Sequence, residues 1–410
     1  MQTFAFDPVE MPAGTSEFRA EVRAFLHDEL GSAPAERRAN SWSVFDAAFS
    51  RKLARRGWIG MTWPKRYGGS ERSALERYVL LEELLAAGAP VGAHWIADRQ
   101  SGPALLRYGT EAQRERYLPA IAQGECFFCI GMSEPNAGSD LASVRTRGVK
   151  TGEGWRITGQ KVWTTHAQQA HTMIALVRTG DGNDVAPEAP AAPAPRGGAS
   201  ALGRPGGGPK RHEGLTQFLI DMNTPGITVR PIPDLVGDVH FNEVFFDEVL
   251  VPHDRLLGQE GQGWQQCTSE LSLERSGPER YLSSHALFVE LLRAAAAPGG
   301  RTSEAMQQLL GCAVAELWTL RQMSLSVAGQ LAAGRDPAVE AAIVKDLGNS
   351  FEQALPRRAQ AVADAGLALE DDAPLARVLA LLLQTSPSFS LRGGTREILR
   401  GIIARGLGLR

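Results

Sequence analysis

Apolar side chains recur at helical spacing through the first 125 residues of the chain. Ser16 has the side-chain chemistry of an N-cap, and after it the apolar positions fit one helix face: Phe18, Val22, Phe25, Leu26 and Leu30. The segment SALERYVLLEELLAAG, residues 73–88, repeats this pattern, and the glycines and proline between residues 57 and 69 mark loops. The pattern predicts an N-terminal helical domain over residues 1–125.

Short runs rich in aromatic and β-branched residues replace the helical pattern from Cys126 onward. Runs such as CFFCIGM, GWRITG, TMIALVR and EVFFDEVLV are separated by Gly, Pro and Asn at intervals typical of antiparallel strands. Residues 126–252 therefore predict a middle β domain, an antiparallel sandwich or barrel. Within it, residues 180–214 consist largely of Pro, Gly and Ala and offer little to bury, so we expect a flexible insert there.

Helical spacing returns in residues 253–410, and the sequence AVEAAIVKDLGNSFEQAL carries it as far as Pro356. Gly258, Gly261 and Gly263 are expected to form the turn into a helix, because no strand-turn-helix context of a dinucleotide site surrounds them. The order of helices, strands and helices lacks the alternation of a Rossmann fold. The expected fold class is α+β and multidomain.

Composition narrows the functional classes. Hydrophobic residues make up 43% and charged residues 22% of the 410, which excludes a disordered chain. The net charge of −3 does not favour a nucleic-acid partner, and neither a secretory signal nor a run of eighteen apolar residues occurs, so we expect a cytoplasmic protein without membrane insertion. Four cysteines are too few for a disulfide framework, and we expect Cys126 and Cys129 to be buried strand residues rather than metal ligands.

Two segments of the middle domain carry candidate chemistry. Residues 131–140, GMSEPNAGSD, follow an apolar strand and bend through Pro, Asn and Gly, which exposes backbone N–H groups and hydroxyls to a ligand. About twenty residues later, Trp163 lies between Lys161 and Thr165. An indole with a hydroxyl close by is suited to stack on a flat heteroaromatic ring and hydrogen-bond its nitrogen.

Together these segments resemble the acyl-CoA dehydrogenase family, and further segments match in order along nearly the whole chain: GWIGMTWPKRYGG, YGTEAQRERYLPAIAQGE, FNEVFFDEVLVPHDRLLGQEGQGW and GGTREILRGIIARGLGL. The resemblance implies an N-terminal helical domain, a middle β domain and a C-terminal four-helix bundle. It also implies FAD bound between the β domain, the bundle and a neighbouring subunit.

The resemblance implies a set of site residues. Met132 and Ser133 would contact the flavin ring, and Trp163 and Thr165 would pack on it and hydrogen-bond it. Thr395 and Glu397 would lie near the FAD phosphates and adenosine. Ser139 would lie near the pantetheine of the substrate.

Dehydrogenation of a thioester requires a base for the α proton, and a carboxylate in a dry pocket is suited to this role. In many relatives a glutamate directly precedes the Gly-Thr of the last motif, but Gly393 occupies that place here. Other relatives carry the base on the first long helix of the C-terminal domain, which corresponds to Glu274, followed by Arg275 in the substrate region. Glu274 is the predicted base, Gly393 is predicted to offer its N–H to the thioester oxygen, and Glu270 and Glu279 remain alternatives.

Three segments depart from the family pattern. In residues 360–366, QAVADAG, Ala363 and Asp364 replace a glycine pair that packs against the FAD pyrophosphate in relatives, and a carboxylate there is electrostatically unfavourable. An Arg-x-x-Phe-Gly segment that relatives use for FAD is absent from residues 288–308. Arg392 takes a place often held by tyrosine and alters the mouth of the expected acyl pocket.

The expected activity is therefore FAD-dependent conversion of an acyl-CoA to a trans-2-enoyl-CoA. Electrons would pass to an electron-transfer flavoprotein, and the bundle would assemble as a homotetramer or homodimer. An FAD-poor or inactive subunit of a hetero-oligomer is one alternative, and a flavin oxidase or monooxygenase on the same fold is another. The sequence leaves open the acyl group, the choice between CoA and an acyl carrier protein, and the pathway.

Overall fold

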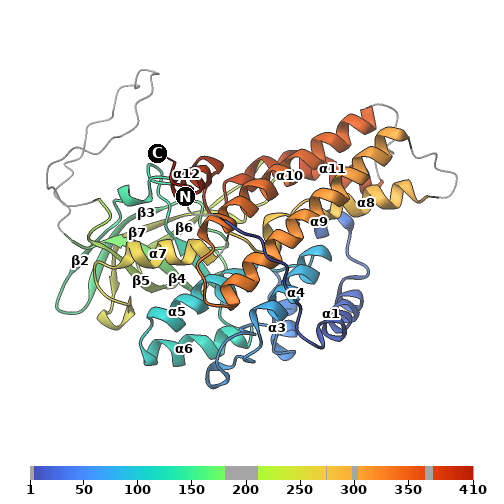
Figure 1. Ribbon diagram of the computed structural model, residues 1–410. Coiled ribbons are helices and arrows are strands. Elements are labelled where there is room, and N and C mark those ends of the chain that lie inside the picture. Colours follow the sequence, from blue (N-terminus) through green and yellow to red (C-terminus); the bar gives the residue numbers. More distant parts are fainter. Residues whose placement is uncertain (1–3, 181–210, 274, 298–302, 365–372, 410) are drawn as a thin grey trace, which may run out of the picture.

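The computed structural model of the chain describes residues 4–180, 211–273, 275–297, 303–364 and 373–409 (Figure 1). The predicted insert, residues 180–214, falls mainly outside this part of the chain. Within the described residues the expected fold class is confirmed: helices come first, a β-sheet follows, and a helical bundle ends the chain. The domain boundaries at 125/126 and 252/253 stay predictions.

The N-terminal helices pack around a core of apolar side chains that includes Val22, Leu53, Val79 and Leu105. Ser73 caps α4, because its hydroxyl accepts from Glu76 N while the Glu76 carboxylate accepts from Ser73 N. The helices of this part are α1 (Thr15–Leu30), α2 (Ala35–Ala39), α3 (Ala47–Arg55), η1 (Lys65–Tyr67), α4 (Ala74–Ala86), η2 (Ala97–Ser101), α5 (Gly102–Tyr108) and α6 (Glu111–Ala122).

The predicted N-cap at Ser16 is wrong. Helix α1 begins at Thr15, and its N-cap is Gly14, which has φ 80°. A turn before the helix explains the difference: Thr15 N and Thr15 Oγ1 both donate to the carbonyl of Pro12, at 3.2 and 2.6 Å. Because glycine adopts a left-handed φ without steric cost, the chain turns at Gly14 and needs no side-chain cap.

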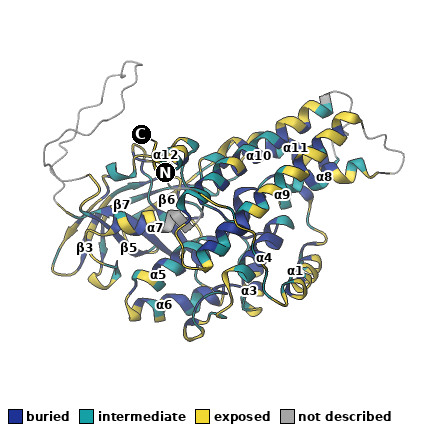
Figure 2. Ribbon diagram, in the orientation of Figure 1, coloured by how far each residue is buried: buried dark blue, intermediate teal, exposed yellow. Residues whose placement is uncertain are grey.

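The middle of the chain forms one sheet with the strand order β6-β7-β3-β2-β4-β5-β8, and β1 pairs with β4. Most neighbours are antiparallel, as expected, but β4 pairs in parallel with β1 and β2. Strands β4 and β5 are buried almost along their whole length, and Figure 2 shows the dark blue of buried residues at β5. The strands are β1 (Phe128–Gly131), β2 (Arg147–Lys150), β3 (Trp155–Lys161), β4 (Thr172–Arg178), β5 (Leu215–Asp221), β6 (Ile227–Ile232), β7 (Phe241–Val251) and β8 (Leu256–Leu257).

Cys126 and Cys129, which lie three residues apart in the sequence, differ in burial and in secondary structure. Cys129 lies in β1 and is buried, as predicted, and burial raises the pKa of its thiol. The prediction that Cys126 is also a buried strand residue is wrong, because Cys126 precedes β1 and is only half-buried. Its backbone N–H bonds to the carbonyl of Ala120, which keeps Cys126 with the end of α6 rather than with the sheet.

Helices α8, α9, α10 and α11 run side by side as the expected four-helix bundle (Figure 1). Helix α7 begins at Gly263, as the glycine pattern predicts, and packs on β5. The sequence pattern carries the helix as far as Pro356, and α10 continues past this residue, because Leu355 and Ala359 on either side are buried in the shared core. The bounds are α7 (Gly263–Leu273), α8 (His285–Ala295), α9 (Glu304–Ala332), α10 (Ala338–Asp364), α11 (Pro374–Thr385) and α12 (Arg396–Gly406).

Candidate active site

The two segments singled out in the sequence meet at one edge of the sheet. Strand β1 leads into Met132 and Ser133, and strand β3 leads through Lys161 into Val162. Although β1 and β3 are not neighbours in the sheet, Val162 N donates a hydrogen bond of 2.9 Å to the carbonyl of Ser133. This bond fixes the loop after β1 against the loop after β3, so that half-buried Met132 and Ser133 lie beside the approach to Trp163.

A buried ion pair supports the contact between the loop after β1 and the loop after β3. The ammonium of Lys161, which is fully buried, lies 2.7 Å from Glu134 Oε1 and 3.2 Å from the carbonyl of Met132. The Glu134 carboxylate also accepts from the backbone N–H groups of Arg145 and Thr146, at 2.6 and 2.9 Å. Burial alone would raise the pKa of Glu134, but Lys161 and these hydrogen bonds lower it below its usual value. The positions of these two residues in the sequence do not predict the pair.

Trp163 stands at a strained corner of the backbone. Its φ is 58°, a left-handed value that is unusual for a bulky residue, and 58% of the residue is exposed. The following residues are tied to β7 and the loop before it: Thr164 N donates to Asn242 O at 3.0 Å and His166 N to His240 O at 2.7 Å. Strain that the surroundings hold in place is typical of functional sites, and here it presents an open indole face.

Phe241 and Thr165 complete this corner. The Phe241 ring lies edge-on to the indole of Trp163, with 5.9 Å between ring centroids. Thr165 is half-buried two residues after Trp163. An exposed indole with a threonine hydroxyl and the Met132–Ser133 loop beside it fits the stacking and hydrogen-bonding surface that an isoalloxazine ring requires.

The bend at residues 134–140 has the turn expected from its sequence. Glu134 and Ala137 exchange both backbone hydrogen bonds, at 2.9 and 3.0 Å, so Pro135 and Asn136 form the tip. Ser139 is exposed just beyond this turn. Its position leaves the hydroxyl accessible to a ligand.

The end of the bundle supplies a second group of predicted residues. Gly393 and Gly394 both have positive φ, and Thr395 directly precedes α12. The Lys345 ammonium of α10 donates to the carbonyl of Gly394 at 2.7 Å, which anchors this loop. Thr395 is half-buried and Glu397 exposed, and the hydrogen bonds of the described residues do not join either of them to the β-domain loops.

Electrostatics link the loop at Gly393 to the corner at Trp163. Burial, with a smaller contribution from the charge of Arg392, lowers the pKa of His240, which directly precedes Phe241. Arg392 therefore lies close enough to the end of the sheet to influence a side chain beside the Trp163 corner. The two groups of predicted residues come from the middle domain and from the C-terminal part of the chain, and the charge of Arg392 connects them.

The predicted base, Glu274, lies outside the described residues, and so does the side chain of Glu270. Arg275 is described and half-buried, and its charge is among those that lower the pKa of Lys345. The alternative Glu279 is buried, with Arg99 Nη1 2.5 Å from its Oε1. Although burial works in the other direction, the charges of Arg99 and Arg280 lower the pKa of Glu279, which makes it a weak base.

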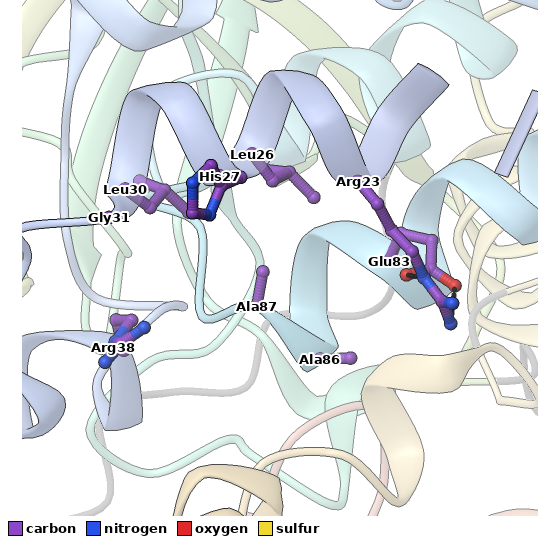
Figure 3. Close-up of a pocket in the computed structure, with 9 residues that line it drawn as sticks. All are labelled: Arg23, Leu26, His27, Leu30, Gly31, Arg38, Glu83, Ala86 and Ala87. Atoms are coloured by element: carbon purple, nitrogen blue, oxygen red, sulfur yellow. Dashed lines mark hydrogen bonds and ion pairs between the residues drawn. The ribbon is translucent and has the colours of Figure 1, made fainter. Parts of the chain in front are cut away.

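Two other features lie apart from these residues. A cavity of about 310 Å³ is lined by N-terminal residues, including Arg23, His27 and Ala87, but by none of the predicted site residues (Figure 3).

Among the described residues, Asp234, Asp238 and His240 approach one another closely enough to suggest a metal site. However, Asp234 Oδ1 accepts from the backbone N–H groups of Val236 and Asp238, so this carboxylate closes a turn.

Comparisons with known proteins find relatives that match nearly the whole chain. Residues 13–125, 129–190 and 261–408 match the N-terminal, middle and C-terminal domains of acyl-CoA dehydrogenases. Acyl-CoA dehydrogenase IpdE1 of Mycolicibacterium smegmatis is 33% identical over 421 residues, which cover 96% of this chain and 97% of that protein. Acyl-CoA dehydrogenase FadE34 of Mycobacterium tuberculosis is 33% identical over 95% of this chain, which spans only 49% of that relative's length.

Solved structures agree with these matches. The Tcur3481–Tcur3483 steroid ACAD has a TM-score of 0.81 and 28% identity, covering 98% of this chain and 99% of that one. The ChsE4–ChsE5 complex of Mycobacterium tuberculosis has a TM-score of 0.79 and 26% identity, covering 98% and 100%. The chain belongs to the acyl-CoA dehydrogenase family. It is thus an oxidoreductase and a flavoprotein of a family that depends on FAD.

The described residues fit the flavin ring of FAD. The prediction for the FAD pyrophosphate concerns a segment that the structure describes only in part. The open indole of Trp163 and the loop at Met132–Ser133 suit the flavin ring. Helix α10 runs through Ala363 to Asp364, and residues 365–372 lie outside the described part, so the predicted effect of Asp364 on the pyrophosphate stays a prediction. Across the described residues, no helix combines the length and apolar character needed to span a bilayer.

Proposed function

We propose that this protein removes the α proton and the β hydride of an acyl thioester, with FAD as the hydride acceptor. The open, conformationally fixed indole of Trp163 beside the Met132–Ser133 loop carries this proposal. Bound FAD would supply the ring that takes the hydride. In this arrangement Trp163 and Thr165 hold that ring, and Met132 and Ser133 line its edge.

Glu274 is the proposed base, with Gly393 N–H as donor to the thioester oxygen. Two observations support this choice over Glu279 and over a base at position 393. Residue 393 has no side chain, and Glu279 forms an ion pair with Arg99. Arg275, the neighbour of Glu274, lies within electrostatic range of Lys345, and Lys345 binds the Gly393–Gly394 loop. This electrostatic link between Arg275 and the Gly393–Gly394 loop supports the choice of Glu274, the residue that precedes Arg275.

The remaining proposed contacts follow from the resemblance to the family. Ser139 and Arg275 would contact the substrate, and Thr395 with Glu397 would lie near the FAD phosphates and adenosine. We further propose electron-transfer flavoprotein as the electron acceptor and a homodimer or homotetramer as the assembly. The acyl carrier can be CoA or an acyl carrier protein.

Anaerobic mixing with acyl thioesters tests the proposed reaction. A panel of straight, branched, aromatic and polycyclic acyl-CoAs is expected to contain at least one compound that bleaches the flavin near 450 nm. The polycyclic arm is included because a similar solved structure is described as a steroid ACAD. Flavin that stays oxidised with every member of the panel, although FAD is bound stoichiometrically, would contradict the proposal.

Trp163→Ala is expected to lower the amount of FAD that copurifies with the chain. The substitution removes the stacking surface, and because more than half of the residue is exposed, the fold loses little buried area. The ratio of flavin to protein absorbance measures the effect. Trp318→Ala is the matched control, since Trp318 is 63% exposed on α9, away from the proposed ring site. Equal loss of flavin in both variants would contradict the role of Trp163.

A second candidate is a subunit of a hetero-oligomeric acyl-CoA dehydrogenase. Two of the similar solved structures, Tcur3481–Tcur3483 and ChsE4–ChsE5, are each described by a pair of gene products, which favours this candidate. Expression of this chain alone distinguishes the two assemblies. Stoichiometric yellow flavin in the isolated chain supports the homo-oligomer, whereas flavin that appears only with a second chain supports the hetero-oligomer.

A further inference from the structure

Aromatic and cationic side chains from distant parts of the sequence gather beside the Gly393 loop. The Arg392 guanidinium lies 4.7 Å from the Trp42 ring centroid and 4.6 Å from that of Phe389. Trp42 in turn lies 4.6 Å from Trp95, and the Arg99 guanidinium lies 4.8 Å from the Trp95 ring. We call Trp42, Trp95, Arg99, Arg280 and Arg392 the Arg–Trp cluster. It joins the N-terminal helices to the end of the bundle.

The cluster reaches the position where relatives carry the glutamate. A Cβ built on Gly393 would lie 3.1 Å from Arg280 Nη2 and 3.6 Å from Lys345 Cε. Arg280 and Lys345 are both buried, and Arg280 Nε lies 3.8 Å from Glu279 Oε1. Cationic groups therefore surround the backbone atoms that the proposed reaction uses to hold the thioester.

The described side chains of this region carry more positive than negative charge. Glu279 is ionised and lies between Arg99 and Arg280. Glu352 is the other buried carboxyl group, and burial raises its pKa, which favours the neutral form. Burial, followed by the charges of Arg280, Arg392 and Arg275, lowers the pKa of Lys345 to about 7. Among the described side chains of this region the cations therefore outnumber the anions, and their charge attracts an anionic ligand.

Two hydrogen-bond donors of the cluster are buried without an acceptor among the described residues. These are Trp42 Nε1 and Arg392 Nε. Arg392 Nη2 donates to Ser283 Oγ at 3.0 Å, so one side of its guanidinium is fixed, while its Nε has no acceptor in the described part of the chain. Buried donors almost always have a hydrogen-bond acceptor. A buried donor without an acceptor costs more free energy than a typical hydrogen bond contributes to stability. An acceptor from a ligand would complete both.

We propose that the Arg–Trp cluster binds a carboxylate carried by the acyl group of the substrate. The inference rests on the proposed function and narrows its substrate class to thioesters whose acyl part bears a second, free carboxylate. Arg392 would hold the carboxylate through charge-assisted hydrogen bonds, and the indole rings of Trp42 and Trp95 would pack against the apolar body of the acyl group. Because Arg392 directly precedes Gly393, the carboxylate and the thioester would be held by adjacent residues.

Matched pairs of thioesters test this inference on the FAD-loaded protein. Each pair consists of a plain acyl-CoA of six, eight or ten carbons and the CoA thioester of the same length with a terminal carboxylate. Anaerobic titration of flavin absorbance gives the affinity of each. At the length that fits, the carboxylated member is expected to bind at least tenfold more tightly than its plain partner.

Substitutions at Arg392 locate the effect. Arg392→Met, which keeps most of the apolar stem, is expected to weaken the carboxylated thioester at least ten times more than it weakens the plain one. Arg392→Lys is expected to restore part of this difference because it restores the charge. Arg358→Met serves as the control, since Arg358 forms an exposed ion pair with Glu316 on the bundle, and it should leave the preference as in the wild type.

The outcomes separate this inference from the proposed reaction. If plain thioesters bleach the flavin and bind as tightly as the carboxylated ones at all three lengths, the carboxylate site is refuted and the dehydrogenase activity stands. Equal weakening of both members by Arg392→Met would also refute it and would assign Arg392 to apolar packing. Should no thioester bleach the flavin, the proposed function fails, and this inference fails with it. If the Arg392 variants do not fold, the wild-type pairs alone decide.

Discussion

Glu274→Gln is expected to slow reduction of the flavin by substrate about 100- to 10,000-fold while FAD stays bound, which is the usual range for loss of a general base. An amide of the same shape cannot take the α proton. Gly393 has no side chain to replace it, and Glu279 is held as an ion between Arg99 and Arg280. Stopped-flow absorbance in a single anaerobic turnover measures the rate, and the flavin content of the purified variant confirms cofactor binding.

Glu270→Gln is the matched control, because Glu270 lies one helical turn earlier in the sequence. Its rate of flavin reduction should stay near that of the wild type. A Glu274→Gln variant that reduces its flavin at the wild-type rate would remove Glu274 from the mechanism. A large loss in Glu270→Gln alone would transfer the role of base to Glu270.

Lys161→Met is expected to destabilise the protein by about 3 to 5 kcal/mol, the usual cost of leaving one partner of a buried ion pair uncompensated. Glu134 would remain buried with only the N–H groups of Arg145 and Thr146, and the carbonyl of Met132 would lose its donor. The loop beside Trp163 is therefore expected to loosen, and FAD should dissociate more readily. Chemical unfolding of the flavin-free chain measures stability, and dilution of the loaded protein measures FAD release.

The pH dependence of this variant has a defined sign. In the folded wild type the pKa of Glu134 is lowered, so the contribution of the pair is present above the ordinary glutamate pKa of about 4.3 and is lost as the pH falls through the lowered value. The gap in stability between wild type and Lys161→Met should therefore narrow in acid. A constant gap from pH 7 to pH 3 would show that the ion pair is not its source.

A double substitution completes the test. Glu134→Gln combined with Lys161→Met removes both charges. The double variant is expected to lose less stability than the sum of the losses in the two single variants, because neither the Glu134 charge nor the Lys161 charge is then buried without its partner. Additive losses would mean that the two side chains do not stabilise each other. In that case each would act only through its own hydrogen bonds to the backbone.

The sequence predicted helices and strands well where a structural feature depends only on residues that are close together in the chain. The helical pattern of residues 73–88 and the glycine turn before α7 depend on neighbours in the chain. The error at Ser16 has the opposite cause, and so does the continuation of α10 past Pro356. A turn that ends at Gly14 and core packing beside Pro356 decide those positions, and neither is visible in the spacing of apolar residues.

The candidate site divides in the same way. Met132, Ser133 and Trp163 belong to short motifs, and the structure brings their loops together. Their support by Glu134 and Lys161 went unnoticed, because a buried ion pair has no periodic signature. The Arg–Trp cluster could not be predicted at all, since Trp42, Arg99, Arg280 and Arg392 lie far apart in the sequence and meet only when the N-terminal helices pack on the bundle.

The left-handed backbone at Gly393 also restricts how this enzyme could evolve. A single substitution to glutamate there would introduce a side chain at φ 66°, a region that disfavours any residue with a Cβ. The new carboxylate would then lie within reach of Arg280 and Lys345, and an ion pair with them would make it too acidic to abstract a proton. A functional base at position 393 would thus require several coordinated substitutions in this chain, which amounts to an epistatic barrier against that arrangement.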